Sequence, residues 1–147
     1  MILHEEPAEY SHWLRLVLLI PIGLVIGAII LAYGQEYEGF FVLMGESVFF
    51  ALLFYFIMPR KYQIYQDKLK IVLGKPFSIN IPLSTIKEVK HSSAIKAFVY
   101  LGIRFATSFN YVVEIVRSKG LNYVISPKNG DVFIEELNQA IKSQARN

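Results

Sequence analysis

Candidate catalytic or metal-binding residues are few in this sequence, and they are far apart along the chain. Glu46 is the one ionisable residue well inside a long apolar stretch. The chain contains three histidines, without metal-ligand spacing between them: His4, His12 and His91. It contains no cysteine, no P-loop, no G-x-S-x-G and no G-x-G-x-x-G pattern. The sequence therefore predicts no catalytic residue, no cofactor and no metal site.

Glu46 has two interpretations that the sequence leaves open. A carboxyl group inside a membrane span is costly, and it is a functional hypothesis by default: a proton- or ligand-responsive group, or a polar contact between subunits. Glu46 follows Phe40 by six residues, which is about 9 Å along a helix. The alternative is a protonated or partly hydrated carboxyl near the interface, hydrogen-bonded to Ser47 or to a backbone group.

Two apolar stretches, of which the second contains Glu46, dominate the N-terminal part of the chain. Each is about as long as a helix that crosses a bilayer core of about 30 Å, and the link between them is short. An acidic lead and a long apolar run favour an uncleaved anchor over a signal peptide. The predicted segments are a transmembrane hairpin over 13–58, with helices over 13–33 and 39–58 and an external loop over 34–38.

Charge is divided unevenly between the two parts of the chain. Residues 1–58 hold one basic and six acidic residues, whereas residues 59–147 hold fourteen basic and six acidic ones. Basic residues follow the second apolar stretch closely, and the loop has none. Since basic flanks stay on the cytoplasmic side, both termini are expected to be cytoplasmic. We expect residues 1–12 to form a separate cytoplasmic lead and the protein to lie in the cell membrane with two spans.

Small residues in the first apolar stretch predict close helix packing. Gly23 and Gly27 form a G-x-x-x-G pattern, which lets two helices approach closely. This face would pack either against the second helix of the same chain or against another subunit. Pro21 is expected to kink the first helix.

From Pro59 onward the apolar residues alternate with polar ones, which predicts strands. Residues 60–82 fit three short strands in a meander, and 83–89 fit a bend followed by a further strand. Residues 111–116 and 121–125 fit a hairpin. The spacing of Phe133, Leu137 and Ile141 predicts a closing helix, with its start at Ser126 or at Asp131. Strands followed by one helix predict an α+β fold.

The segment 91–110 is apolar, aromatic and lightly basic, and it allows two interpretations. In the first, it holds one or two strands of the sandwich joined by a long hairpin. In the second, residues 97–101 form an exposed tip that enters the bilayer surface, with Lys96 and Arg104 at the headgroups.

Three runs of this domain resemble the bacterial pleckstrin-homology-like (PH-like) domains that follow membrane helices. They are KYQIYQDKLKI (61–71), IPLSTIKEV (81–89) and ISPKNGDVFIEEL (125–137). The resemblance covers most of residues 60–142. It implies a seven-stranded, bent antiparallel sandwich or barrel capped by the C-terminal helix, and it implies no particular activity. Eukaryotic relatives bind phosphoinositides through a basic pattern in the first hairpin, of which this chain offers Lys68 and Lys70.

These features predict a non-catalytic PH-like domain over 59–147 that scaffolds proteins or contacts anionic membrane lipid. The basic residues expected to contact lipid are Lys61, Lys68, Lys70, Lys75, Lys96 and Arg104. The alternative is a structural membrane protein that self-associates through its hairpin, with Gly23, Gly27 and Glu46 in the contact. A transport or proton-responsive role for Glu46 is a third hypothesis. Nucleic acid is not an expected partner, because the basic residues are scattered rather than clustered.

Overall fold

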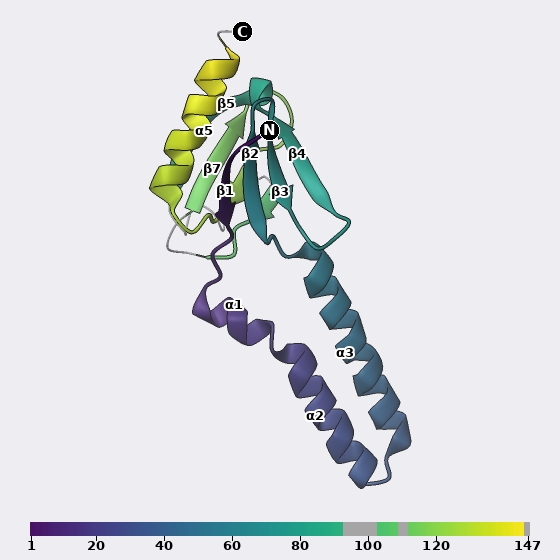
Figure 1. The fold of residues 1–147 in the computed structure, drawn as a ribbon. Coiled ribbons are helices and arrows are strands. Elements are labelled where there is room, and N and C mark those ends of the chain that lie inside the picture. Colours follow the sequence, from purple (N-terminus) through teal and green to yellow (C-terminus); the bar gives the residue numbers. More distant parts are fainter. Residues whose placement is uncertain (93–102, 109–111, 146–147) are drawn as a thin grey trace. The chain divides into compact units, whose positions relative to one another are not determined.

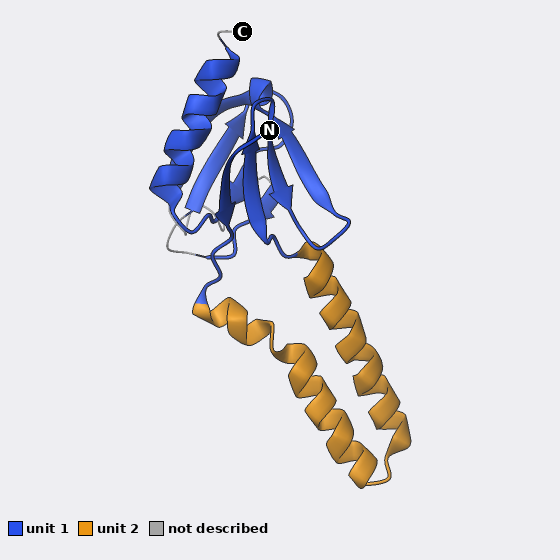
Figure 2. Ribbon diagram, viewed as in Figure 1, with its two compact units in different colours: residues 1–11, 58–147 blue, residues 12–57 orange. Residues whose placement is uncertain are grey.

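The computed structural model describes residues 1–92, 103–108 and 112–145, and it divides into two compact units. One unit joins residues 1–11 to 58–147, and the other is the intervening segment 12–57 (Figure 2). The first unit contains strands β1 (Ile2–Pro7), β2 (Lys61–Tyr65), β3 (Lys68–Val72), β4 (Ser78–Pro82), β5 (Ile86–Ser92), β6 (Ile103–Phe105), β7 (Val112–Arg117) and β8 (Tyr123–Ile125), the short 3-10 helix η1 (Leu83–Thr85) and helix α5 (Gly130–Gln144). The domain interrupted by a helical insertion is therefore the larger unit.

The strands form two four-stranded sheets (Figure 1). The first has the order β1-β2-β3-β4 and is antiparallel throughout, as the alternation over 60–82 predicts. The second has the order β5-β7-β8-β6, and its β6–β8 pair is parallel. The α+β prediction is confirmed. Within the described residues the sheets do not close into a barrel, and eight strands are present where the family resemblance implied seven.

Inward-facing apolar side chains of both sheets form one core, which α5 covers. Tyr62, Ile64, Leu69 and Ile71 of the first sheet are fully buried, and so are Val113, Ile115 and Ile125 of the second. From α5, Phe133 and Leu137 enter the same cluster, as their helical spacing predicts. The rings of Phe133 and Tyr62 meet edge to face, with centroids 5.9 Å apart. The helix packs on strands of both sheets and so holds the two layers together.

The N-terminal segment is a strand of this domain, and the predicted separate lead over 1–12 is wrong. β1 pairs with β2 from Ile2, opposite Tyr65, to Pro7, opposite Lys61. The buried carboxylate of Glu6 accepts hydrogen bonds from the backbone N–H and the side-chain amide of Asn129, at 3.0 and 2.9 Å. The strand thus contacts both the first sheet and the residue that precedes α5.

One further prediction for the domain is corrected, and another lies partly outside the described residues. Neither Ser126 nor Asp131 begins the last helix: it begins at Gly130, and the buried Ser126 hydroxyl donates to the Ser108 carbonyl instead. Of the segment 91–110, the described part contains the end of β5 and the strand β6, which lie at opposite edges of the second sheet and so do not pair with each other. The predicted hairpin would lie in residues 93–102, outside the described part of the chain. The predicted membrane-entering tip at 97–101, with Lys96, lies outside the described residues.

The inserted unit is a helical hairpin of α1 (His12–Val17), α2 (Ile20–Tyr33) and α3 (Tyr37–Ile57). The first predicted helix is broken by a turn at Leu18–Leu19 rather than merely kinked. Pro21 explains the break, since a proline ring clashes with the carbonyl four residues earlier, here that of Val17. The segments His12–Tyr33 and Tyr37–Ile57 are both long and apolar enough to cross a membrane.

Candidate functional site

The outer face of the first sheet brings together three of the predicted lipid-contacting lysines. Lys61, Lys68 and Lys70 alternate with inward-facing residues on β2 and β3, so their side chains share the solvent face. Lys70 lies opposite Gln63 on one side and Asn80 on the other. The ammonium group of Lys68 lies 5.6 Å from the centre of the Tyr65 ring, within cation–π range.

Lys61 differs from the other two because β1 supplies a counter-charge. Its ammonium group lies 3.0 Å from both carboxylate oxygens of Glu5, and Gln63 also donates to that carboxylate. Hydrogen bonds from Gln63 and Lys61 hold the pKa of Glu5 below its usual value. Lys68 and Lys70 therefore carry the net positive charge of this face.

The remaining predicted basic residues lie elsewhere. Lys75 is exposed in the turn between β3 and β4. Arg104 is exposed on β6, in the other sheet, so it does not belong to the same face. Lys96 lies outside the described residues. The six predicted residues thus do not form one site, and the compact part of the set is Lys68 with Lys70.

The two chain ends that connect to the hairpin are tied together at one end of the domain. The Tyr10 hydroxyl donates to the Pro59 carbonyl at 2.5 Å, and the Ala8 N–H donates to the Arg60 carbonyl at 3.0 Å. The Glu9 and Ser11 N–H groups donate to the carbonyls of Ser126 and Thr107. This closure was not predicted, because its partners are far apart in sequence and no local pattern reports them.

The buried phenol of Tyr62 contacts Ser126, which also takes part in this closure. The Tyr62 hydroxyl donates to the Phe105 carbonyl and accepts the Ser126 N–H, both at 3.3 Å. Burial raises the pKa of Tyr62 well above its ordinary value. Below about pH 10 both folded and unfolded chains keep this proton, and above it the unfolded chain loses the proton first. The contribution of Tyr62 to stability is therefore lost as the pH rises past that value.

Replacing Tyr62 by Phe should change both the stability and its pH dependence. At pH 7 we expect the variant to lose about 1–3 kcal/mol, because Phe105 and Ser126 each lose a buried partner. Above pH 10 the difference in unfolding free energy between the parent and the variant should narrow by up to about 1.4 kcal/mol per pH unit, because only the parent loses stability through Tyr62. Urea unfolding of the full chain in detergent micelles, followed by tyrosine circular dichroism from pH 7 to 11, measures both. Tyr65→Phe, on the outer face of the same strand, is the control. Parallel curves for Tyr62→Phe and the parent would contradict this prediction.

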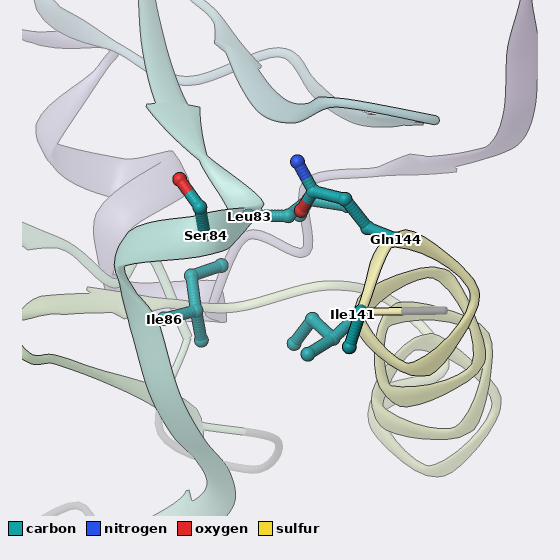
Figure 3. A pocket seen from close by; sticks show the side chains of 6 residues that line it. Leu83, Ser84, Ile86, Ile141 and Gln144 are labelled. Carbon is teal, nitrogen blue, oxygen red and sulfur yellow. The ribbon is translucent and has the colours of Figure 1, made fainter. Parts of the chain in front are cut away.

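A shallow groove lies between η1 and the end of α5 (Figure 3). It has a volume of about 420 Å³ and is lined by Leu83, Ser84, Ile86, Ile141, Gln144 and Ala145. Its polar groups are one hydroxyl and one amide, and none of its lining residues is ionisable. The groove can hold an apolar group, and it offers no acid, base or nucleophile beyond that hydroxyl.

The described histidines of the domain pair with carboxylates, one within β1 and one between β5 and α5. The Nε2 atom of His4 lies 3.3 Å from Glu6, and that of His91 lies 2.8 Å from Asp131 in the first turn of α5. Over the described part of the chain, no group of three His, Asp or Glu residues could hold a metal ion.

The two glycines predicted to allow close packing, Gly23 and Gly27, have different surroundings in the hairpin. A Cβ atom on Gly27 would lie 3.2 Å from the Leu43 side chain, so Gly27 allows α2 and α3 of the same chain to pack closely. A Cβ atom on Gly23 would meet nothing within 4 Å. The contact made by Ser47 was not predicted from the sequence. Its buried hydroxyl donates to the Pro21 carbonyl at 2.9 Å and joins the two helices.

Glu46 is exposed on this hairpin, and it is the tenth of the 21 residues of α3. It lies about 14 Å along the axis from the helix start, deeper than the 9 Å expected from Phe40. Its neighbour Ser47 bonds to Pro21, so the expected bond between Glu46 and Ser47 is absent from the described contacts.

Two packed four-stranded sheets with a C-terminal helix over their shared core define the larger unit as a PH-like domain. In agreement, residues 60–140 match the family described as Bacterial PH domain, and this match covers more than half of the chain. The chain belongs to the bacterial PH domain family. Neither the curated proteins nor the solved structures include a match. β1 and the hairpin lie outside the matched residues.

Proposed function

We propose that this protein is a non-catalytic, membrane-anchored PH-like module that contacts anionic lipid at the cytoplasmic face of the cell membrane. The hairpin is the anchor. The solvent face of the first sheet, through Lys68 and Lys70, is the lipid contact.

The exposure of the hairpin's apolar side chains is the observation that carries the anchoring role. Among residues 12–57, all of which are described, α2 buries Ala28 and α3 buries Ser47, and no other residue of these two helices is buried. Large apolar side chains point outward all around both helices, including Ile22, Ile30 and Phe49 at 57, 64 and 61% exposure. A helix that is apolar on every side requires an apolar surrounding. Lipid provides it.

The discontinuous domain supports a topology with both termini on one side of the membrane. β1 precedes the hairpin and β2 follows it, yet they pair in one sheet. Two spans return the chain to its starting side, which this pairing requires. The basic residues after Ile57, beginning with Arg60 and Lys61, support a cytoplasmic location for that side.

The basic face supports lipid contact through its composition. Lys68 and Lys70 are two residues apart on one strand, and the exposed Asn80 adds a hydrogen-bonding side chain beside Lys70. A basic residue near an anionic membrane surface contributes about 1 kcal/mol of attraction. Two such residues on a domain that is already tethered are enough to orient it.

Charge reversal tests this contact. Because the chain has no cysteine, Asn80→Cys can carry one fluorophore on the basic face of the full protein in nanodiscs. Quenching by a lipid-borne quencher should increase when phosphatidylglycerol replaces phosphatidylcholine. Adding Lys68→Glu and Lys70→Glu should reduce the lipid-contacting population about tenfold or more, given about 1 kcal/mol per charge.

The control is Lys87→Glu with Lys90→Glu, which makes the same change in net charge on β5 of the other sheet. Quenching should survive in this control and weaken with added salt. If quenching falls equally in both double variants, the attraction to the lipid depends on the net charge of the domain and not on the basic face of the first sheet. Quenching that never responds to phosphatidylglycerol would reject lipid contact and favour a scaffold for proteins.

Self-assembly through the hairpin is a second candidate function, and the exposed position of Glu46 favours it.

A further inference from the structure

One face of α3 combines a carboxyl group with a surface notch. Val42, Gly45, Glu46 and Phe49 follow the spacing of a single helix face, and all four are exposed on the hairpin. The face lies beside the one that packs on α2, where Leu43 and Ser47 make their contacts.

Glu46 has no partner on its own hairpin. It makes no hydrogen bond or ion pair with any residue of the described chain, and Arg15, the one basic residue of this unit, does not pair with it. A carboxyl group near the middle of a span costs at least a few kcal/mol unless another polar group meets it. The partner must therefore come from outside the hairpin.

We propose that Glu46 pairs with Glu46 of a second copy of this chain, across a twofold axis between two α3 helices. This inference rests on the proposed insertion of the hairpin in a membrane. A neutral carboxyl group carries both a donor and an acceptor, so two copies satisfy each other reciprocally without any cation. Isologous contact of this kind needs only one surface patch, and the patch is present in every copy.

Gly45 allows the approach that this pairing requires. A Cβ atom at Gly45 would meet nothing within 4 Å, so the notch beside Glu46 opens outward rather than toward α2. Small residues at such positions let two helix backbones come close enough for side-chain hydrogen bonds. Val42 and Phe49, which are 60 and 61% exposed, supply apolar contact on either side.

Cysteine crosslinking of the full chain in membranes tests the proposal. Val42→Cys lies on the proposed face, and Val48→Cys is the matched control on another exposed side of α3. Under mild oxidation at high lipid dilution, Val42→Cys should form dimers several times faster than Val48→Cys. Adding Glu46→Leu should weaken the dimer about tenfold. Glu46→Gln should preserve it, because an amide also donates and accepts.

Equal crosslinking at positions 42 and 48 would overturn the proposal, and so would a dimer that Glu46→Leu leaves unchanged. Crosslinks at position 42 to a different protein only, in native membranes, would also reject the second copy as partner. Carbonate extraction of the same membranes measures insertion independently. A protein that is extracted fails as a membrane anchor, whereas one that is retained but not crosslinked fails only as a dimer.

Discussion

A chain of residues 58–147 alone should fail to fold, whereas residues 1–11 joined to 58–147 by about six Gly and Ser residues should form a soluble, folded domain. The first chain lacks β1, so β2 loses a ladder of five residue pairs and becomes an edge strand. It also lacks Glu6, whose carboxylate accepts the Asn129 N–H before α5. Each lost hydrogen bond costs about 0.5–1.5 kcal/mol. The summed loss therefore approaches the unfolding free energy of a whole domain, which is about 5–15 kcal/mol.

The joined chain is feasible because the two ends of the domain already lie side by side. The Ala8 N–H donates to the Arg60 carbonyl at 3.0 Å, and the Tyr10 hydroxyl donates to the Pro59 carbonyl at 2.5 Å. A linker of six residues reaches about 20 Å at most, which is ample for such ends. Removing the hairpin also removes the exposed apolar surface, so the product should stay in solution without detergent.

Circular dichroism, light scattering and amide NMR dispersion of the two chains provide the comparison. A joined chain with the order of residues 2–7 scrambled keeps length and charge, and it should behave like the chain without β1. If residues 58–147 alone are as well folded as the joined chain, β1 is dispensable. That result would contradict the assignment of β1 to the domain.

The second large effect should come from Phe133→Ala, which we expect to cost about 3–5 kcal/mol of unfolding free energy. Phe133 is fully buried, and its ring meets that of Tyr62 edge to face at 5.9 Å. The side chain links α5 to the first sheet, so its loss leaves a cavity between them. Such a loss is a large fraction of the stability of a small domain.

Val132→Ala is the control for this substitution. Val132 precedes Phe133 on the same helix but is 49% exposed, and its change should cost well under 1 kcal/mol. Urea unfolding of the full chain in detergent micelles, read by pulse proteolysis, compares the two. Similar midpoints for the two variants would show that Phe133 is not a central contact of the core.

Local patterns were enough to predict the first meander, the β7–β8 hairpin and the apolar face of α5. In β3 and α5 the apolar residues alternate or repeat over a continuous stretch, and their burial follows that pattern. β1 could not be predicted in this way. Its inward side carries His4 and Glu6, its outward side carries Leu3 and Glu5, and its partner strand lies more than fifty residues away.

The six residues predicted to contact lipid do not form one site, and the reason is similar. Lys68 and Lys70 share a face because they are two residues apart on one strand, which the sequence alone indicates. Lys61 sits on the same face, but its neutralisation by Glu5 depends on the long-range pairing of β1. Arg104 lies in the other sheet because of a strand order that no local pattern reveals.

The interrupted domain has a consequence for biosynthesis. β1 leaves the ribosome first, but β2, its partner, follows only after the entire hairpin. Until then residues 1–11 have no sheet to join, and in the proposed two-span topology they must remain on the side of the membrane where synthesis continues. Completion of the fold then joins both ends of the hairpin through the β1–β2 ladder. After that point, inverting the proposed anchor would require unfolding the domain.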